Sequence, residues 1–228
     1  MEVFYNEFIT KGGYTVALEG LLATVEIAVF GLLIGILLGT VIAVVRVMPK
    51  YKVLPRVLDV ICNIYVGFFR GTPMTVQLLV GYYVLLPALN IRADGVVVAI
   101  VMFGLNSAAY VSEIMRSGIQ SVDIGQLEAA RALGMPYAMS MLKIVIPQSI
   151  KNILPTLGNE FIVLIKDTSI VSFIAVVDLT KAFRQIGDAT YEYVVPYIFL
   201  AIVYLVLVIG ITMLIRLMER RLKKSERG

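Results

Sequence analysis

Polar and ionisable side chains inside otherwise apolar stretches are the residues of this chain that could do chemistry. Glu160 and Asp167 belong to the stretch 153–177, and Asn106 lies in the stretch 95–115. Burying such groups in a membrane is costly, so each is by default a hypothesis for a functional site. A carboxylate attracts a cation, and an amide both donates and accepts hydrogen bonds. These residue types therefore predict a binding site for a small polar or cationic molecule.

Each of these candidates also has a structural interpretation. Asp167 can pair with its neighbour Lys166 or cap a break in the helix next to Ser169. Asn106 can form a hydrogen bond between two helices instead of contacting a ligand. Glu160 has no obvious partner within its own helix, so the sequence offers no structural partner for its charge.

A second polar group surrounds Pro73, where the segment 69–73 interrupts an apolar region. Thr72 and Gln77 flank this turn, and they either contact a ligand or satisfy backbone groups that the break leaves free. The full set of candidate ligand-binding residues is Asn106, Glu160, Thr72, Gln77, Asp167 and Ser169.

The spacing of the polar residues groups them on two helix faces. One face carries Glu160, Leu164 and Asp167, and the other carries Asn106, Tyr110 and Glu113. With a rise of 1.5 Å per residue, Asn106 lies about 16 Å into its helix, and the two acids lie about 10 and 21 Å from the inner end of theirs. Because the hydrocarbon core is about 30 Å thick, the acids bracket the midplane, and both faces are expected to line a central cavity.

Further charged residues lie near the ends of these helices. Glu113 and Arg116 are three residues apart, a spacing that predicts a structural or gating ion pair. Arg70 is expected either at the inner interface or paired with an acid.

The composition is that of a membrane protein. Hydrophobic residues make up 59% of the 228 residues and charged residues only 16%. The net charge of +4 does not indicate a nucleic-acid partner, because the basic residues gather in particular loops and in the C-terminal tail. The chain has no histidine and one cysteine, Cys62, which argues against a metal site and excludes a disulfide within the chain.

Five apolar segments predict membrane-crossing helices, each of which needs about 20 residues. The predicted spans are about 15–47, 56–89, 94–118, 150–177 and 192–218, which form one all-α membrane domain over 1–228. In the first span, Gly31, Gly35 and Gly39 repeat every four residues, a pattern suited to close helix packing. In the second, residues 54–69 are either an interfacial or tilted segment before a main span that begins at Pro73, or part of one continuous kinked helix.

The distribution of basic residues predicts the orientation. Five spans place the two termini on opposite sides of the membrane, and the cytoplasmic side carries the excess of Lys and Arg. Basic residues gather in the loop 46–56, in the long loop 116–150 and in the tail from Arg216 onward. These segments are therefore predicted to be cytoplasmic, with the N-terminus outside and the C-terminus inside.

The long loop contains a predicted short helix, about 124–135. Asp123 can cap its start, Gly134 is suited to the position just after its last residue, and Pro136 prevents its continuation. A helix of two to three turns is not stable alone in water, so it must pack on another surface. That surface is either its own membrane domain or the groove of a cytoplasmic partner.

The sequence of this loop resembles the EAA loop of bacterial ABC importer permeases. In that family EAA is followed by three residues, Gly, nine residues and Ile-x-Leu-Pro, and here Ile146 replaces the leucine. The matching positions are Glu128-Ala129-Ala130, Gly134, Ile144 and Pro147. The segments FFRGTPMTVQ (68–77), AAYVSEIMRSGIQSVDIGQLEAARALGM (108–135) and LGNEFIVLIKDTSIVS (157–172) are similar to the polar amino acid uptake branch of that family.

This resemblance implies the type I ABC importer permease fold and a role as the permease subunit of an ATP-driven amino acid importer in the bacterial inner membrane. The helix 124–135 would be a coupling helix, which contacts a separate ATPase through Glu128, Ala129, Ala130 and Gly134. The chain lacks a G-x-x-x-x-G-K-[ST] segment, so ATP and Mg²⁺ would bind to that partner. The chain itself would then hold no cofactor and would not be an enzyme.

The implied assembly contains two ATPase subunits, a second permease chain that forms a homodimer or a heterodimer, and an extracytoplasmic amino acid binding protein. Its other partners would be the amino acid and membrane lipid, and no nucleic acid. Because a basic amino acid adds a second positive charge, Glu160 favours Arg, Lys or His as substrate. The Asn159-Glu160-Phe161 context also resembles permeases for glutamine.

Two other function classes remain as alternatives. An ion-coupled secondary transporter often shows inverted repeats of similar length, and five spans with one long loop lack that symmetry. A channel or a purely structural subunit is a further possibility, but no ring of repeated polar residues indicates a selectivity filter.

Overall fold

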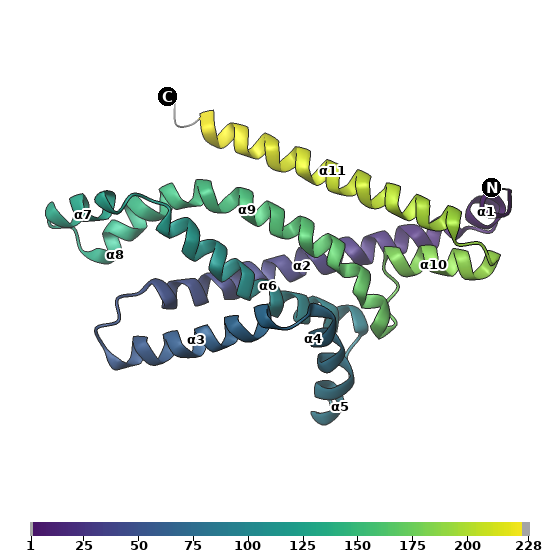
Figure 1. Cartoon of the computed structure of the whole chain (residues 1–228), viewed down its shortest axis with the longest axis horizontal. Coiled ribbons are helices and arrows are strands. Elements are labelled where there is room, and N and C mark those ends of the chain that lie inside the picture. Colours follow the sequence, from purple (N-terminus) through teal and green to yellow (C-terminus); the bar gives the residue numbers. More distant parts are fainter. Residues whose placement is uncertain (1, 225–228) are drawn as a thin grey trace.

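The protein is elongated and helical in this computed structural model, which describes residues 2–224, with side chains up to Arg221. Its long helices lie side by side along the long axis, while α4 and α5 turn across it (Figure 1). The elements are α1 (Glu2–Tyr5), η1 (Asn6–Thr10), α2 (Gly13–Val47), α3 (Val53–Gly71), α4 (Met74–Val80), η2 (Gly81–Leu85), α5 (Leu86–Ala88), α6 (Gly95–Gln120), α7 (Ile124–Ala132), α8 (Tyr137–Ser140), η3 (Met141–Val145), α9 (Ile146–Asp167), η4 (Thr168–Ile174), α10 (Leu179–Thr190) and α11 (Val194–Lys224).

The helices relate to the predicted spans in different ways. The first and third predicted spans, 15–47 and 94–118, fall on α2 and α6, and the fifth, 192–218, falls largely on α11. By length and apolarity, Gly13–Val47, Gly95–Gln120 and Val194–Arg221 are the helices of the described chain that can cross a membrane. The predicted span 56–89 is divided between α3 and the α4–η2–α5 segment, and the span 150–177 is divided between α9 and a 3₁₀ turn, η4.

The break between α3 and α4 follows from the sequence at Pro73. A proline disfavours helical geometry in the residue before it, and Thr72 is extended with φ −121° and ψ 146°. Pro73 is extended too, and α4 starts at Met74. Residues 54–69 are regular helix within α3, and the chain turns sharply at the break (Figure 1).

Close packing of α2 against α6 forms the centre of the fold. A Cβ atom added to Gly35 would lie 2.6 Å from Ser107 Oγ, and one added to Gly39 would lie 2.8 Å from Val111 Cβ. Only glycine permits this approach, so the prediction of a packing stripe on α2 is confirmed. Because the contact positions advance together along both helices, α2 and α6 run parallel.

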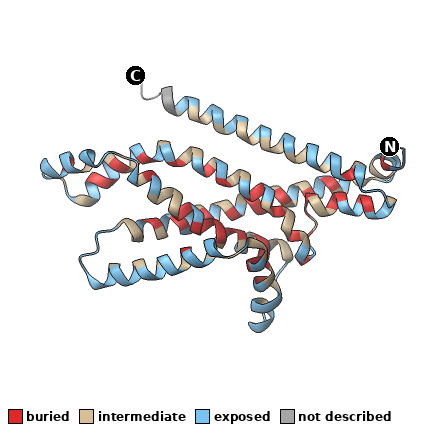
Figure 2. Ribbon diagram, viewed as in Figure 1, coloured by how far each residue is buried: buried red, intermediate tan, exposed pale blue. Residues whose placement is uncertain are grey.

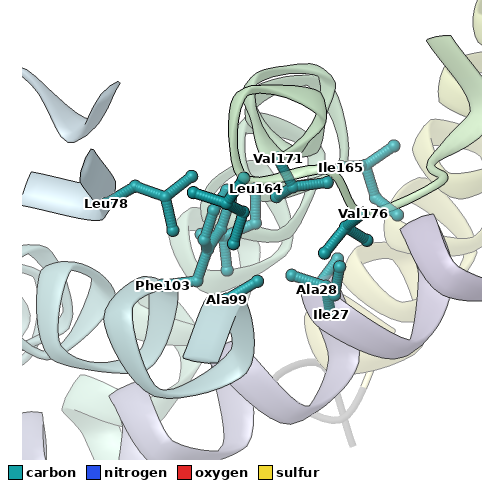
Figure 3. Close-up of a cluster of buried hydrophobic side chains, with 10 residues drawn as sticks. Ile27, Ala28, Leu78, Ala99, Phe103, Leu164, Ile165, Val171 and Val176 are labelled. Carbon is teal, nitrogen blue, oxygen red and sulfur yellow. The ribbon is translucent and has the colours of Figure 1, made fainter. Parts of the chain in front are cut away.

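The apolar core lies where α2, α6, α9 and η4 meet. Figure 3 shows Ile27, Phe103 and Leu164 converging with residues of the neighbouring helices. Burial is concentrated along α2, α6 and α9, while α3 and α11 are exposed along most of their length (Figure 2). In a membrane protein such apolar exposed faces are suited to lipid or to another chain.

Different helices lie at the two ends of the bundle. The C-terminal end of α11 lies at the same end as α7 and α8, and α1 lies with α10 at the opposite end (Figure 1). α6 and α9 run antiparallel, since Ser107 pairs with Glu160 whereas Gly118 packs on Ile153. The helix directions and the position of α11 therefore place the long loop and the C-terminal end of α11 at the same end of the bundle.

Candidate functional site

Three of the predicted ligand-binding residues form one hydrogen-bonded group at the break between α3 and α4. Asn106 Nδ2 donates to Gln77 Oε1 at 2.8 Å and to the Phe69 carbonyl at 3.2 Å. Gln77 Nε2 lies within hydrogen-bonding distance of the Phe69 carbonyl (2.8 Å), the Thr72 carbonyl (3.0 Å) and Thr72 Oγ1 (2.8 Å). The two amides thus bind the backbone that the helix break leaves free.

This geometry explains why amides occupy these positions. The last carbonyl groups of a helix have no partner within it and must find one elsewhere, above all in an apolar environment. Gln77 and Asn106 are both buried, and their polar atoms are engaged with each other and with α3. Gln77 thus satisfies free backbone groups and Asn106 forms a hydrogen bond between two helices, which are the structural roles considered for them from the sequence. Ligand contact by these residues stays a prediction.

Glu160 lies between α9 and α6. Its side chain is 8% exposed, and Ser107 Oγ donates to Oε1 at 3.0 Å. Within the described part of the chain Oε2 accepts no hydrogen bond, yet it is not fully enclosed. Leu164, one turn further along the same face, belongs to the apolar core. At these two positions this face of α9 therefore packs against the neighbouring helices, and the cavity expected along it stays a prediction.

Asp167 and Ser169 lie apart from the other candidates, at the junction of α9 and η4. Asp167 is half-buried, and its side chain makes no capping hydrogen bond to the turn that follows. The carbonyl of Ser169 accepts a hydrogen bond from Ser172 Oγ at 3.2 Å. The capping interpretation of Asp167 is thus wrong in this structure, and its role in ligand contact stays a prediction.

A cluster of arginines surrounds Glu113 on α6. Arg46 Nη1 lies 2.6 Å from Oε1, and Arg116 Nε and Nη2 lie 3.1 and 2.7 Å from Oε2. Arg70 Nη1 is more distant, 3.8 Å from Oε1, and its guanidinium lies 5.4 Å from the centre of the Tyr110 ring. The predicted pair of Glu113 with Arg116 is present. Arg70 lies beside an acid, as expected, and its place relative to the inner interface stays a prediction.

Sequence reasoning missed Arg46 as a member of this cluster. Its position at the end of α2 was visible, but only the packing of α2 beside α6 brings it to Glu113. It also missed a row of exposed polar residues on α9, Asn152, Thr156 and Asn159. Their helical spacing was a usable signal, and Asn152 Nδ2 donates to Ser121 Oγ at 2.8 Å. No group of three His, Cys, Asp or Glu residues within the described chain could hold a metal ion.

The short helix of the long loop is α7, and its two ends are as predicted. Asp123 caps its start by accepting a hydrogen bond from the Gly125 amide at 2.7 Å. The helix ends at Ala132, slightly before the expected limit, and Gly134 has φ +83°. Residues with a Cβ atom rarely adopt a φ of this sign, so glycine is favoured where the chain leaves the helix.

One side of α7 packs on the chain itself and the other side is open. Ala130 is 2% exposed and faces inward, where α7 packs against η3 and α8. Glu128 and Ala129 are exposed, and Leu133 is 85% exposed. Of the two surfaces that were expected to support this helix, its own domain is therefore one, and a free face remains for a partner.

A cavity of about 510 Å³ lies between α7 and the ends of α2 and α6. Its lining includes Leu127, Met141 and Tyr137. The Tyr137 hydroxyl donates to the Val47 carbonyl at 3.5 Å, and burial, with a smaller contribution from nearby Tyr51, raises the pKa of this phenol. The neutral phenol thus links α8 to the end of α2 at physiological pH.

Known proteins resemble this chain over nearly its whole length. The model of the family described as "Binding-protein-dependent transport system inner membrane component" matches residues 20–224. "Arginine transport system permease protein ArtQ" of Bacillus subtilis is 41% identical over 209 residues, covering 92% of this chain and 93% of that protein. "Putative glutamine transport system permease protein GlnP" of Rickettsia prowazekii is 37% identical over 205 residues, covering 90% and 92%.

Two solved structures are similar in fold. A chain of the "Crystal structure of an amino acid ABC transporter with histidines" is 40% identical, with a TM-score of 0.85 over 94% of this chain and 98% of that one. A chain of the MetNI methionine ABC transporter in an inward-facing conformation has a TM-score of 0.71 at 17% identity, over 93% and 96%. The second similarity concerns the fold alone.

Proposed function

Because this chain belongs to the family of binding-protein-dependent transport system inner membrane components, we propose that it is the translocating subunit of an ATP-driven importer for a basic amino acid. Arg, Lys or His would be the cargo, and a separate ATPase would hydrolyse ATP. The chain is a multi-pass inner-membrane permease, with its N-terminus outside and its C-terminus in the cytoplasm in this proposal.

The observation that carries the choice of substrate is the buried carboxylate of Glu160. Its one hydrogen bond within the described chain comes from a neutral hydroxyl, and no cation pairs with it. A buried carboxylate without a cationic partner is costly, and in membrane segments such residues mark substrate or ion pathways. A cationic side chain of the cargo would supply the missing charge.

The names of the relatives support two cargo classes. One similar permease is named for arginine and another for glutamine, at comparable identity. A glutamine importer is therefore the second candidate, and it would not need the charge of Glu160. The response of cargo preference to this one carboxylate separates the two candidates.

Energy coupling would proceed through α7. Its exposed face carries Glu128, Ala129 and Leu133, next to the turn at Gly134. The helix α7 lies at the same end of the molecule as the C-terminal end of α11 (Figure 1). The two ATPase subunits of the proposed assembly would dock there, one on each of two permease chains, with an extracytoplasmic binding protein at the opposite end.

The test is uptake by the reconstituted importer carrying Glu160→Gln, which removes the charge and keeps the shape. We expect arginine uptake to fall about 10- to 100-fold, since interactions with a buried charge contribute about 1.5–3 kcal/mol. Glu19→Gln, on the exposed outer part of α2, is the matched control and should behave as wild type. Unchanged arginine uptake and unchanged ligand-stimulated ATP hydrolysis in Glu160→Gln would contradict the assignment.

A further inference from the structure

We propose that Arg70 binds the α-carboxylate of the amino acid as it passes through the membrane. The inference rests on the proposed import of an amino acid, but it holds for a basic cargo and for glutamine alike. All α-amino acids carry this carboxylate, so Arg70 would bind the part that different cargoes share, whereas Glu160 would bind the cargo's side chain.

The first argument is the charge balance around Glu113. Both of its oxygens are already in close contact, one with Arg46 at 2.6 Å and the other with Arg116 at 2.7 Å. Arg70 approaches no closer than 3.8 Å, and 45% of its side chain is exposed. Three cations share one carboxylate, which leaves Arg70 as the guanidinium with capacity for another anion.

The second argument is the position of Arg70 in depth. It is the penultimate residue of α3, next to Phe69, whose carbonyl accepts a hydrogen bond from Asn106. Asn106 lies about 16 Å into α6 at a rise of 1.5 Å per residue. The backbone of Arg70 is therefore near the midplane of a core about 30 Å thick. Its guanidinium lies further inward, beside Tyr110 and Glu113, at about 22–27 Å along α6 and still within that core.

An exposed guanidinium at this depth does not fit a lipid-facing surface. Charged residues in membrane segments face the bundle interior or a water-filled cavity, and there they mark substrate pathways. Tyr110, whose ring lies under the guanidinium, is partly exposed on the same side. The exposed surface beside Arg70 thus includes an aromatic ring with a polar hydroxyl, a pairing suited to a pathway.

The surface of α3 next to Arg70 is open at two glycine positions. A Cβ atom placed on Gly67 or Gly71 would meet no atom of the described residues within 4 Å. Stacking on Tyr110 restricts the guanidinium and leaves its planar set of donors available. Such a fork matches a carboxylate with two parallel hydrogen bonds, which lysine does not provide.

The cargo carboxylate and Glu160 would lie at neighbouring levels. Ser107, the hydrogen-bond donor to Glu160, precedes Tyr110 by three residues on α6. This spacing is about 4.5 Å along the helix axis, at a rise of 1.5 Å per residue. Along the axis of α6, one amino acid is therefore long enough to extend from the level of the Tyr110 ring to that of Ser107.

The test compares ligands with and without the carboxylate on the purified permease–ATPase complex, in the absence of binding protein. L-arginine is paired with agmatine, its decarboxylated form, and L-glutamine is paired with 4-aminobutanamide. Calorimetry gives the ratio of the two dissociation constants for each pair. In wild type we expect the carboxylate-bearing ligand of the accepted pair to bind about 10- to 100-fold more tightly.

Arg70→Gln should reduce this ratio to less than about threefold, by weakening only the ligand that has the carboxylate. Arg70→Lys, which keeps the charge and loses the fork, should retain an intermediate ratio. Arg184→Gln, an exposed arginine on α10, is the matched control. Thermal denaturation of each variant shows whether it is folded, and Arg70→Lys carries the test if Arg70→Gln is not.

The ratio of dissociation constants distinguishes failure of the Arg70 proposal from failure of the proposed function. An unchanged ratio in the Arg70 variants overturns this inference and leaves amino acid import intact, whereas a wild-type complex that binds neither ligand pair removes both proposals. Loss of co-purified anionic lipid from the variants, at an unchanged ratio, would assign Arg70 to a lipid phosphate and would also overturn it.

Discussion

Replacing Gln77 with leucine is expected to destabilise the joint between α3 and α4. Gln77 Nε2 lies 2.8 Å from the Phe69 carbonyl and 3.0 Å from the Thr72 carbonyl, and its Oε1 accepts from Asn106 at 2.8 Å. Leucine has nearly the same size but none of these polar atoms. The change therefore removes hydrogen bonds while leaving the packing of α4 almost intact.

The magnitude follows from what is left without a partner. The Phe69 carbonyl keeps Asn106 as a donor, at 3.2 Å, whereas the Thr72 carbonyl loses the side-chain donor that it has in this structure. An unpaired buried group costs about 1–3 kcal/mol, and each lost hydrogen bond about 1 kcal/mol. The expected loss is about 3 kcal/mol, which for a chain of this size is about 6–12 °C in Tm.

The assay is thermal denaturation of the purified complex, together with amino acid uptake. Val76→Leu, an exposed change on the same helix, serves as control and should stay within about 1 °C of wild type. Asn106→Leu should be less harmful in the Gln77→Leu background than alone, because the two side chains share one bond. A Tm of Gln77→Leu within about 2 °C of wild type, with uptake abolished, would refute this reasoning and would make Gln77 a ligand contact.

Two further comparisons use paired positions that differ in their surroundings. Gly35→Leu should lower the free energy of unfolding by about 3 kcal/mol, because even its Cβ would lie 2.6 Å from Ser107 Oγ. Gly210→Leu is the control and should behave as wild type, because no described atom lies within 4 Å of a Cβ at residue 210. Equal Tm values for the two variants would contradict this expectation. Ala129→Trp should lose the co-purifying ATPase at an unchanged Tm, since Ala129 is exposed. Ala130→Trp should instead lower the Tm, since Ala130 is 2% exposed. The same behaviour in both variants would argue against a partner on the open face of α7.

Local features of the fold could be predicted from the sequence because their causes are local. A glycine every four residues indicates close packing wherever the partner helix lies, and Gly35 meets α6 as expected. The ends of α7 follow in the same way from Asp123 and Gly134, because capping and a positive φ depend only on neighbouring backbone. Pro73 likewise indicates a break between two helices, whatever surrounds it.

The contacts between helices could not be predicted, because they depend on which faces meet. Helical spacing groups Glu160 with Leu164 on one face, but it does not tell whether that face meets a cavity or another helix. Arg46 is 67 residues from Glu113 in the chain, and their ion pair exists only because α2 runs parallel to α6. Ser107 is inconspicuous in sequence, since a single hydroxyl in a membrane helix is easily satisfied by its own backbone.

Asn106 and Ser107 are adjacent residues of α6 that make polar contacts with two different helices. Asn106 binds the carbonyl of Phe69 at the end of α3, and Ser107 donates to Glu160 on α9. Successive residues of a helix point about 100° apart, which allows these neighbours to reach different helices. A shift of α6 relative to either partner therefore stretches one of the two hydrogen bonds. Because Glu160 and Arg70 lie on those two partners, such a shift would change the distance between the carboxylate and the guanidinium proposed to hold the cargo.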